Sequence, residues 1–301
     1  MTKITGTQEK AEVKKTADAQ GEPETLMEIQ PRNIEGKETL RDTHSRDIEF
    51  EGIVNARDLG GLQTMDGKTV RRGCLIRSAN LFKATPSDVE SLQKNWHLRL
   101  IIDLRTPMAA GMKPDAEVPG ARYLAFPLFE DAMIGVTHES DRDYPRRKTV
   151  MPDMRDLYRM MVLHPKCRER FGKMLMLILQ NDYDEGSVLW HCSEGKDRCG
   201  LTAAFLLTML KVDFSSIAED YLLTNRINRD KAEDYYRQCL ANGAEEKVAM
   251  SVRNAFLARE DYLAAAFDSI LKEYEDMDHY FTQGLQIPEK MIEKFCEEMK
   301  I

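Results

Sequence analysis

The most informative stretch of the chain reads Ser187-Val188-Leu189-Trp190-His191-Cys192-Ser193-Glu194-Gly195-Lys196-Asp197-Arg198-Cys199-Gly200 and sets one cysteine six positions before one arginine. Residues 187–190 form a short apolar run typical of a strand, and the Ala/Leu-rich residues 201–210 favour a buried helix. A loop between a strand end and a helix start directs its backbone N–H groups at one point, with the helix dipole behind them. The segment therefore predicts a site that binds a dianion.

The side chains of this loop suit phosphate transfer. A thiol near cations and a helix N-terminus has a pKa of roughly 3.5–7.5, so Cys192 can act as a nucleophile. Arg198 offers a planar fork that matches two phosphate oxygens. The residues expected to surround the phosphate are Ser193, Glu194, Gly195, Lys196, Asp197 and Arg198.

Two plainer interpretations of the loop remain open at this point. Most free cysteines are small buried hydrophobes, and Lys196-Asp197-Arg198 would then be a solvated charge run. A metal site at Cys192 and Cys199 would need a second Cys/His pair at ligand spacing, which the sequence lacks. We therefore expect no metal and no cofactor.

The pattern His-Cys-x-x-Gly-Lys-Asp-Arg-x-Gly resembles the signature of the atypical bacterial tyrosine phosphatases, the tyrosine/lipid phosphatase family of the cysteine-dependent phosphatases. Other segments resemble motifs of this family in the same order, from about residue 48 to the C-terminus: Asn55–Gly61, Cys74–Ser78, Ile101–Arg105 and Asp220–Asn225. The resemblance implies the cysteine-phosphatase fold and a phosphoric monoester hydrolase that acts on phosphotyrosine.

The predicted elements favour an α/β fold. Residues 54–64 and 69–76 predict a hairpin closed by an Asp-Gly turn. A helix starts at Thr85-Pro86, and buried strands cover residues 98–104 and 121–128. Further helices are predicted over residues 153–163, 166–180, 215–225, 231–242, 245–257, 261–274 and 288–299. This order indicates a mostly parallel central sheet of about four to five strands flanked by helices, with a helix-rich C-terminal half.

Composition divides the chain into two parts. Residues 1–45 contain no aromatic residue and few apolar positions, so we predict a disordered or flexible tail. Residues 46–301 form the expected phosphatase domain. Within it, residues 129–151 follow no steady period, and a loop of this length is usually functional or disordered. We interpret it as a lid beside the site, with a solvated surface excursion as the alternative.

Charge and hydropathy limit the function further. A net charge of −8 gives no support to nucleic-acid binding, which needs a basic face. The N-terminal residues lack the apolar core of a signal peptide, and no run approaches the roughly eighteen apolar residues of a membrane span. The six cysteines are scattered, which suits a reducing compartment. We therefore expect a cytoplasmic protein without an integral membrane segment, although export without an N-terminal signal stays open.

The residue types also imply a mechanism. The Cys192 thiolate attacks phosphorus to form a phosphocysteine intermediate, which water then hydrolyses. Arg198 and the loop amides stabilise the charge on the transferring group, in place of a metal ion. His191 is expected to order the loop and tune the thiolate rather than to move protons.

Three aspartates are candidates for the general acid that protonates the leaving oxygen. Asp197 lies inside the loop, and the family resemblance favours it. Asp103 ends a predicted strand beside the site, but it could instead pair with Lys196 or Arg105 and hold the loop. Asp131 lies in the irregular segment, where the acid of a movable loop would be found.

Two loop residues bear on the substrate. Lys196 would add a second cation to the cradle, and the resembled family is associated with phosphoinositides as well as phosphoproteins; alternatively, Lys196 pairs with a carboxylate and stiffens the loop. Glu194, where this family usually has a small residue, should repel polyphosphorylated headgroups. We therefore expect a phosphotyrosine protein or peptide as substrate. A phosphoinositide or dual-specificity phosphatase is the first alternative, and a non-catalytic phosphate-binding module is the second.

Cys199 departs from the resembled family, which has Thr or Ser after the arginine to stabilise the departing thiolate. A thiol donates a weaker hydrogen bond, so we expect slow hydrolysis of the intermediate and faster turnover in Cys199→Thr. Cys199 could also trap oxidised Cys192 as a reversible disulfide, provided that the two Cα atoms lie within about 7 Å.

Overall fold

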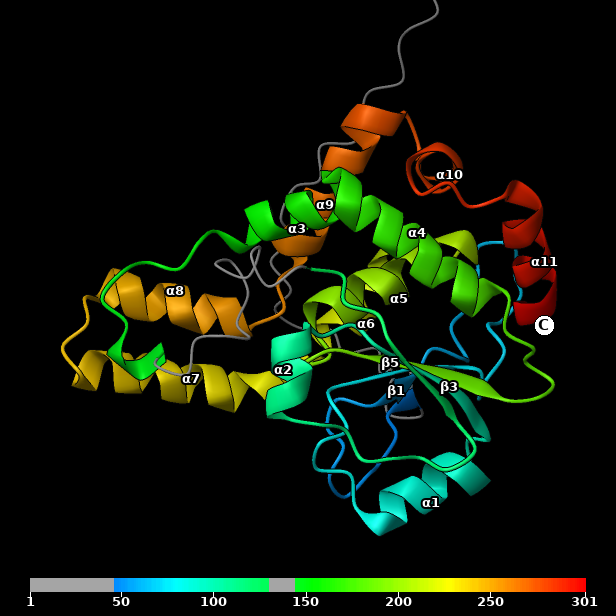
Figure 1. Ribbon diagram of the computed structural model, residues 1–301. Helices are drawn as coiled ribbons and strands as arrows, with labels where there is room; N and C mark the ends of the chain where they lie inside the picture. Colours follow the sequence, from blue (N-terminus) through cyan, green and yellow to red (C-terminus); the bar gives the residue numbers. More distant parts are fainter. Residues whose placement is uncertain (1–45, 130–143) are drawn as a thin grey trace, which may run out of the picture. The chain divides into compact units, whose positions relative to one another are not determined.

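The computed structural model of the chain describes residues 46–129 and 144–301. Its sheet has five strands in the order β1-β2-β5-β3-β4 (Figure 1). Their bounds are β1 Arg57–Asp58, β2 Leu75–Ser78, β3 Leu98–Asp103, β4 Arg122–Ala125 and β5 Ser187–His191. The β1–β2 pair is antiparallel, and the other three pairs in this sheet are parallel. The predicted α/β fold with a mostly parallel sheet is therefore confirmed.

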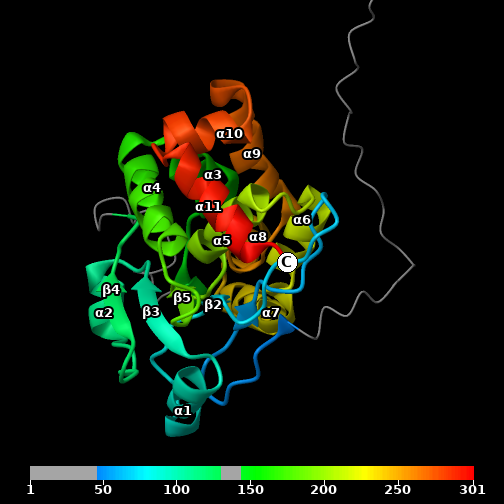
Figure 2. The same cartoon turned by 90° about the vertical axis from the view of Figure 1, so that its right-hand side faces the viewer.

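Helices cover both faces of the sheet, with α1 on one face and α4, α5 and α6 on the other, as the two views show (Figures 1 and 2). The helices of the described ranges are α1 Pro86–Lys94, α2 Pro107–Met112, α3 Met154–Leu163, α4 Pro165–Leu179, α5 Asp197–Met209, α6 Phe214–Leu222, α7 Asn225–Ala241, α8 Glu246–Phe256, α9 Glu260–Tyr274, α10 Met277–His279 and α11 Glu289–Met299. Two short turns, Tyr144–Arg146 (3-10) and Tyr280–Gly284 (π), complete them. The predicted helix-rich C-terminal half is confirmed.

The two faces of β5 explain why its sequence is apolar throughout. Val188 and Trp190 belong to the large core that also includes the residues of α5, whereas Leu189 belongs to a smaller cluster with Leu92 of α1. Successive residues of a strand point to opposite faces, so a strand covered on both sides needs a continuous apolar run. Burial of β5 on both faces fixes the position of the residues that follow it.

Most predicted elements are present with shifted ends. Thr85 caps α1 in a reciprocal capping box with Asp88, as the Thr-Pro start predicts. The predicted hairpin has fewer paired residues than its predicted strands imply. The Gln63–Thr69 bridge and the positive φ of Gly67 confirm its turn. The helix after the cysteine begins at Asp197, four residues before its predicted start. An aspartate in a first turn interacts favourably with the helix dipole, which the apolar periodicity used for the prediction does not register.

Two further differences have local causes. α7 begins at Asn225 rather than at residue 231, because its first turns are polar and show no apolar period. α2 was not predicted, although Thr106 caps it and Pro107 opens it, because it is only six residues long and contains a glycine. The predicted tail, residues 1–45, lies outside the described residues, as does most of the predicted lid, residues 130–143. In the described ranges, no helix is long and apolar enough to cross a membrane.

Candidate active site

The residues that follow β5 form the centre of the site. We call residues 192–196 the cysteine loop; they connect the end of β5 to the start of α5, as predicted. β2 and β3 flank β5 in parallel, so Ser78 and Asp103 both lie in register with His191. Because the carboxyl ends of parallel strands meet at one edge, this edge gathers the polar residues of three strands beside the cysteine loop.

The carbonyl groups of the cysteine loop are held from outside. Asn80, Asn55 and Arg77 donate side-chain hydrogen bonds to the carbonyl oxygens of residues 193–195, in that order, at 2.8, 2.8 and 2.7 Å. The C=O and N–H of a trans peptide point in opposite directions. The N–H groups of residues 194–196 therefore face away from these three donors and form a nest that suits an anion.

Gly195 allows this turn for a steric reason. Its φ of +67° lies in the left-handed region, which side chains with a Cβ atom rarely adopt. A Cβ atom there would also lie 2.7 Å from the carbonyl carbon of Ser78. The close contact between the cysteine loop and the end of β2 thus requires glycine at this position.

A buried charge cluster supports the cysteine loop. Asp220 lies 2.7 Å from Arg46, 3.0 Å from Arg77 and 3.4 Å from Arg57, measured between carboxylate oxygens and guanidinium nitrogens. All four residues are at most 5% exposed. Burial alone would raise the pKa of Asp220, but the surrounding guanidinium groups hold it well below its usual range. Three cations around one carboxylate leave surplus positive charge beneath the loop, and Arg77 belongs to both the cluster and the loop.

The pKa of the Cys192 thiol is lowered to about 6. Burial favours the neutral thiol, but the hydrogen bond from Cys199 and the charge of Arg198 outweigh it and favour the thiolate. Burial, together with the neighbouring thiolate, raises the pKa of Cys199 well above its ordinary value. Cys199 therefore stays protonated, and its Sγ atom also lies 3.7 Å from the carbonyl oxygen of Ser78 and 3.9 Å from that of Trp190. Its role in thiolate support remains a prediction.

Arg198 reaches from the first turn of α5 to the end of β3. Its Nη1 atom donates to the carbonyl oxygen of Leu104 at 3.1 Å, and its guanidinium carbon lies 5.5 Å from the centroid of the Phe129 ring. The arginine is 5% exposed. These contacts hold the guanidinium plane beside the cysteine loop.

The side chains of Asp197 and Lys196 contact each other and also have different further partners. The Asp197 carboxylate accepts a hydrogen bond from Tyr158 at 2.8 Å and lies 3.4 Å from the Lys196 ammonium group. That ammonium group, 1% exposed, donates to the carbonyl oxygens of Ala255 and Leu257 at the end of α8. The expected second cation of the phosphate cradle is thus not observed, because the Lys196 side chain caps a helix C-terminus and pairs with a carboxylate.

Glu194 should repel a phosphate group less than its own charge implies. Its carboxylate pairs with the ammonium group of Lys231, from α7, at 2.6 Å. The pair is partly exposed, and the Lys231 nitrogen also lies 5.1 Å from the centroid of the Phe256 ring. Lys231 therefore offsets the negative charge that Glu194 brings to the rim of the site.

Asp103 occupies the second role considered for it, since it pairs with Arg105. Arg105 lies 2.7 Å from Asp103 and 2.5 Å from Asp115, and the Tyr123 hydroxyl donates to Asp103 at 2.6 Å. Burial would raise the pKa of Asp103, but the hydrogen bonds from Arg105 and the nearby His191 lower it to about 2. This aspartate is therefore ionised at neutral pH.

His191 lies between the two carboxylates of this cluster. Its Nδ1 atom is 3.7 Å from Asp103, and its Nε2 atom is 3.2 Å from Asp115. These three residues have the types and proximity of metal ligands, but the guanidinium group of Arg105 already lies against both carboxylates. Among the described residues, neither ring nitrogen of His191 has a hydrogen-bond partner, so its expected role in ordering the loop remains a prediction.

Sequence reasoning missed four residues of the site: Asn80, Asp115, Tyr158 and Lys231. Asn80 follows the Cys74–Ser78 motif directly, and that proximity was a usable signal. The other three lie on α3, on α7 and in the α2–β4 connection, and no local pattern relates them to Cys192. Asp131, the third acid candidate, lies outside the described residues.

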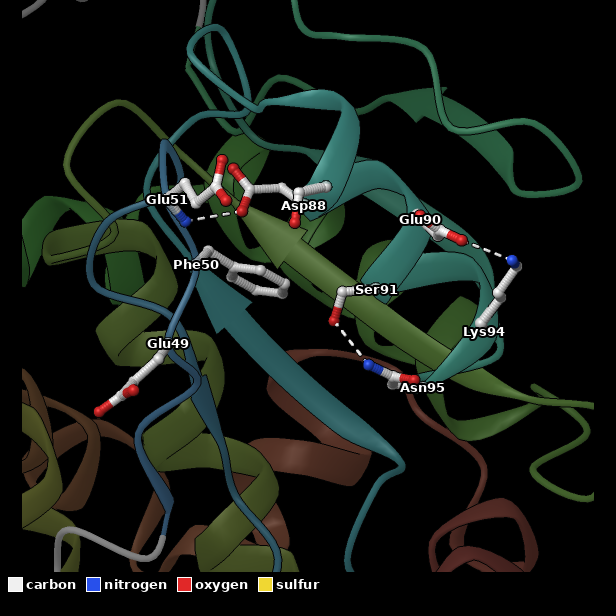
Figure 3. Close-up of a pocket in the computed structure, with 9 residues that line it drawn as sticks. Glu49, Phe50, Glu51, Asp88, Glu90, Ser91, Lys94 and Asn95 are labelled. Carbon is white, nitrogen blue, oxygen red and sulfur yellow. Dashed lines mark hydrogen bonds and ion pairs between the residues drawn. The ribbon is translucent and has the colours of Figure 1, made fainter.

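A hollow elsewhere on the molecule does not resemble the cysteine loop. Figure 3 shows it against α1, with Glu49, Glu51 and Glu90 around it and one basic residue, Lys94, at its side. Asp88 is already engaged there by the backbone N–H groups of Glu51 and Gly52. This acidic lining does not suit a phosphate, so the cysteine loop remains the candidate site.

The comparison with known proteins agrees with the geometry. A family described as the tyrosine phosphatase family matches residues 48–300. The chain belongs to this family. A Cupriavidus necator protein assigned as a tyrosine-protein phosphatase is 31% identical over 244 residues, which cover 80% of the chain and 85% of that protein. The predicted family and enzyme class are thereby confirmed for this family member.

Two more distant similarities accompany this match. A tyrosine-protein phosphatase of Nostoc commune is 28% identical over 152 residues, or 50% of the chain and 47% of that protein. Crystal structures of P. aeruginosa TpbA, one of them in complex with phosphotyrosine, are 18% and 19% identical to this phosphatase family member. They cover 63% of it and 89% of their own chains, with a TM-score of 0.28.

Proposed function

We propose that the protein hydrolyses phosphotyrosine in a protein or peptide through a phosphocysteine intermediate on Cys192. The observation that carries this proposal is the geometry of the cysteine loop, whose N–H groups form a nest beside Cys192 while three side chains hold its carbonyl groups from outside. The pKa of the Cys192 thiol, lowered to about 6, agrees with this geometry. A thiol with this pKa is mostly ionised at neutral pH and is a strong nucleophile. Membership of the tyrosine phosphatase family supports the same substrate class.

The reaction has two steps. In the first, a bond forms between the Cys192 sulfur and phosphorus while the bond from phosphorus to the leaving oxygen breaks, and an acid protonates that oxygen. In the second, water attacks phosphorus, its proton passes to the carboxylate that the acid left behind, the sulfur–phosphorus bond breaks, and the thiolate is restored. The N–H groups of residues 194–196 and the Arg198 guanidinium stabilise the charge on the transferring group in both steps.

We assign the acid to Asp197. It lies one residue after the cysteine loop and is largely but not fully buried, with its side chain 14% exposed. Asp103, by contrast, has a pKa of about 2 and holds no proton to donate at neutral pH. Its two carboxylate oxygens are also occupied by Arg105. These contacts support a structural role for Asp103 and a catalytic role for Asp197.

The loop contacts also favour a substrate with one phosphate group. Because Lys196 is engaged by α8 and by Asp197, it offers no second cation to a polyphosphorylated headgroup. The Glu194–Lys231 pair, however, removes the repulsion expected from Glu194. A phosphoinositide therefore remains the second candidate substrate.

Phosphate release tests the proposal. We expect the wild type to release phosphate from a phosphotyrosine peptide at least about tenfold faster, by kcat/KM, than from phosphoinositide vesicles, and Cys192→Ser to abolish both. Asp197→Asn should lower kcat on phenyl phosphate by about a hundredfold while affecting p-nitrophenyl phosphate much less, because a good leaving group needs no acid. Asp103→Asn should lower both rates equally. Binding of phosphate without turnover would instead indicate a non-catalytic module.

A further inference from the structure

The carboxylate of Asp197 is held by a row of hydroxyl groups. Tyr158 of α3 lies 2.8 Å from Asp197 Oδ1, and its hydroxyl oxygen lies 2.6 Å from that of Tyr221 of α6. Tyr158 is 0% exposed and Tyr221 is 1% exposed, so neither belongs to the solvent-facing surface.

We propose that Tyr158 and Tyr221 are positioning residues for Asp197, forming a directional hydrogen-bond relay that aims the carboxyl group at the leaving oxygen. The inference rests on the proposed function, because it requires Asp197 to be the acid. The two tyrosines contact neither substrate nor phosphorus and act only through Asp197.

The chemistry of the donors sets the direction of the relay. An ionised carboxylate only accepts hydrogen bonds, so the single proton of Tyr158 points at Asp197. The Tyr158 oxygen must then accept from Tyr221, since each hydroxyl has one proton to donate. Every link therefore points toward Asp197 when its carboxylate is charged.

Both hydroxyl groups keep the protons that the relay needs. Burial, and secondarily the charge of Asp197, raise the pKa of both tyrosines well above the ordinary value. Both groups thus remain protonated donors across the working pH range. Asp197 is also the first residue of α5, and the described contacts of its side chain fall on Oδ1, from Tyr158 and Lys196. Oδ2 is the oxygen left to carry the transferred proton.

A matched set of tyrosine variants tests the relay. Tyr158→Phe removes the donor to Asp197 and keeps the ring. Tyr221→Phe removes only the donor to Tyr158. Tyr262→Phe is the control, since its ring lies 5.8 Å from the Tyr158 ring but its hydroxyl donates to the Asn254 carbonyl. The readouts are kcat and KM on phenyl phosphate and on p-nitrophenyl phosphate.

We expect Tyr158→Phe to lower kcat on phenyl phosphate by about tenfold and to change kcat on p-nitrophenyl phosphate less than about twofold, with KM unchanged on both. Losing the donor leaves the carboxyl group free to turn, so proton transfer to a poor leaving group slows, whereas a good leaving group needs no acid. Tyr221→Phe should act in the same direction with a smaller effect. Tyr262→Phe should change none of these quantities.

Further outcomes separate this inference from the proposed function. In an Asp197→Asn background, Tyr158→Phe should have no additional effect on the ratio of the two substrates. Equal loss on both substrates would overturn the relay while leaving the phosphatase activity established. Should Tyr158→Phe fail to fold, equal loss on both substrates in Tyr221→Phe would overturn it as well. A wild type without turnover would instead overturn the proposed function.

Discussion

The acidity of one thiol depends on its neighbour in the helix. Cys192 is 2% exposed, and burial by itself disfavours a thiolate. Its pKa is nevertheless about 6, with the Cys199 hydrogen bond as the largest contribution that lowers it. A thiol is a weak hydrogen-bond donor, so we still expect Cys199 to give slow hydrolysis of the intermediate. The same donor can nevertheless stabilise the Cys192 thiolate in the resting enzyme.

Cys199→Ala should raise the pKa of Cys192, because it removes this donor. The midpoint of Cys192 alkylation by iodoacetamide should move upward by about one pH unit from its wild-type value, and the acidic limb of kcat/KM should move with it. Cys199→Thr retains a donor and should leave the alkylation midpoint at or below the wild-type value. An unchanged midpoint in Cys199→Ala would contradict this account of the thiolate.

At the scale of single residues, local spacing was sufficient to predict that Cys192 and Arg198 flank a loop between a strand and a helix. Arg198 follows Cys192 by six positions, and these positions connect a strand to a helix. Tyr158 could not be identified, since it precedes Asp197 by 39 residues and meets it only when α3 packs near α5. The Lys196 side chain shows the same limit, because its partners at the end of α8 are 59 and 61 residues away.

The elements around β5 explain how the cysteine loop keeps its shape. The loop carbonyls are held by residues that follow or end β2 and by Asn55 before β1. A preorganised nest does not reorganise on binding, so its donors act at full strength when charge develops. The resembled motifs at Asn55–Gly61 and Cys74–Ser78 therefore share one physical task.

Asn80→Ala should weaken anion binding without unfolding the protein. Asn80 donates to the Ser193 carbonyl from a partly exposed position, and one hydrogen bond of this kind corresponds to about a threefold to tenfold change in affinity. The inhibition constant of inorganic phosphate should rise by that factor. Asn95→Ala, on α1 beside the hollow of Figure 3, removes a hydrogen bond to Ser91 and serves as the control. Equal effects of the two variants would argue against the nest.

Element prediction succeeded where one periodic signal dominated. The continuous apolar run of β5 and the Thr-Pro start of α1 are examples, and both are confirmed. It was less successful at polar helix starts such as Asp197 and Asn225, where capping and dipole interactions set the boundary. Those boundaries matter, since the early start of α5 is what places Asp197 in a helical first turn next to Tyr158.

Across the whole molecule, one carboxylate joins segments that are distant in sequence. Asp220 of α6 contacts Arg46, 174 residues earlier in the chain, and Arg77 of β2, 143 residues earlier. No local pattern in the sequence could indicate this cluster, because its members come from three separate elements. Removing one partner from a buried ion pair lowers the free energy of unfolding strongly, because it leaves a buried charge without a counter-charge. This loss is much larger than the gain in stability of the intact pair over apolar side chains in its place.

Asp220→Asn should therefore destabilise the protein by about 3–5 kcal/mol in urea unfolding at pH 7. The folded-state pKa of Asp220 lies below its unfolded value, so its stabilisation is present above about pH 4 and is lost as pH falls toward the folded-state pKa. The difference between wild type and variant should shrink accordingly in acid. Asp278→Asn, which removes an exposed pair with Lys211, should cost less than about 1 kcal/mol. A constant difference down to pH 3 would contradict the assigned cause.

The covalent intermediate on Cys192 is the most direct test of the central claim. A rapid-quench reaction of the wild type with a ³²P-labelled phosphotyrosine peptide should place one label on the peptide that contains Cys192, and the label should decay at the rate of turnover. Asp197→Asn should slow formation of the label with poor leaving groups, and Cys192→Ser should give no label. Phosphate release without labelling of Cys192, or turnover that persists in Cys192→Ser, would contradict the mechanism.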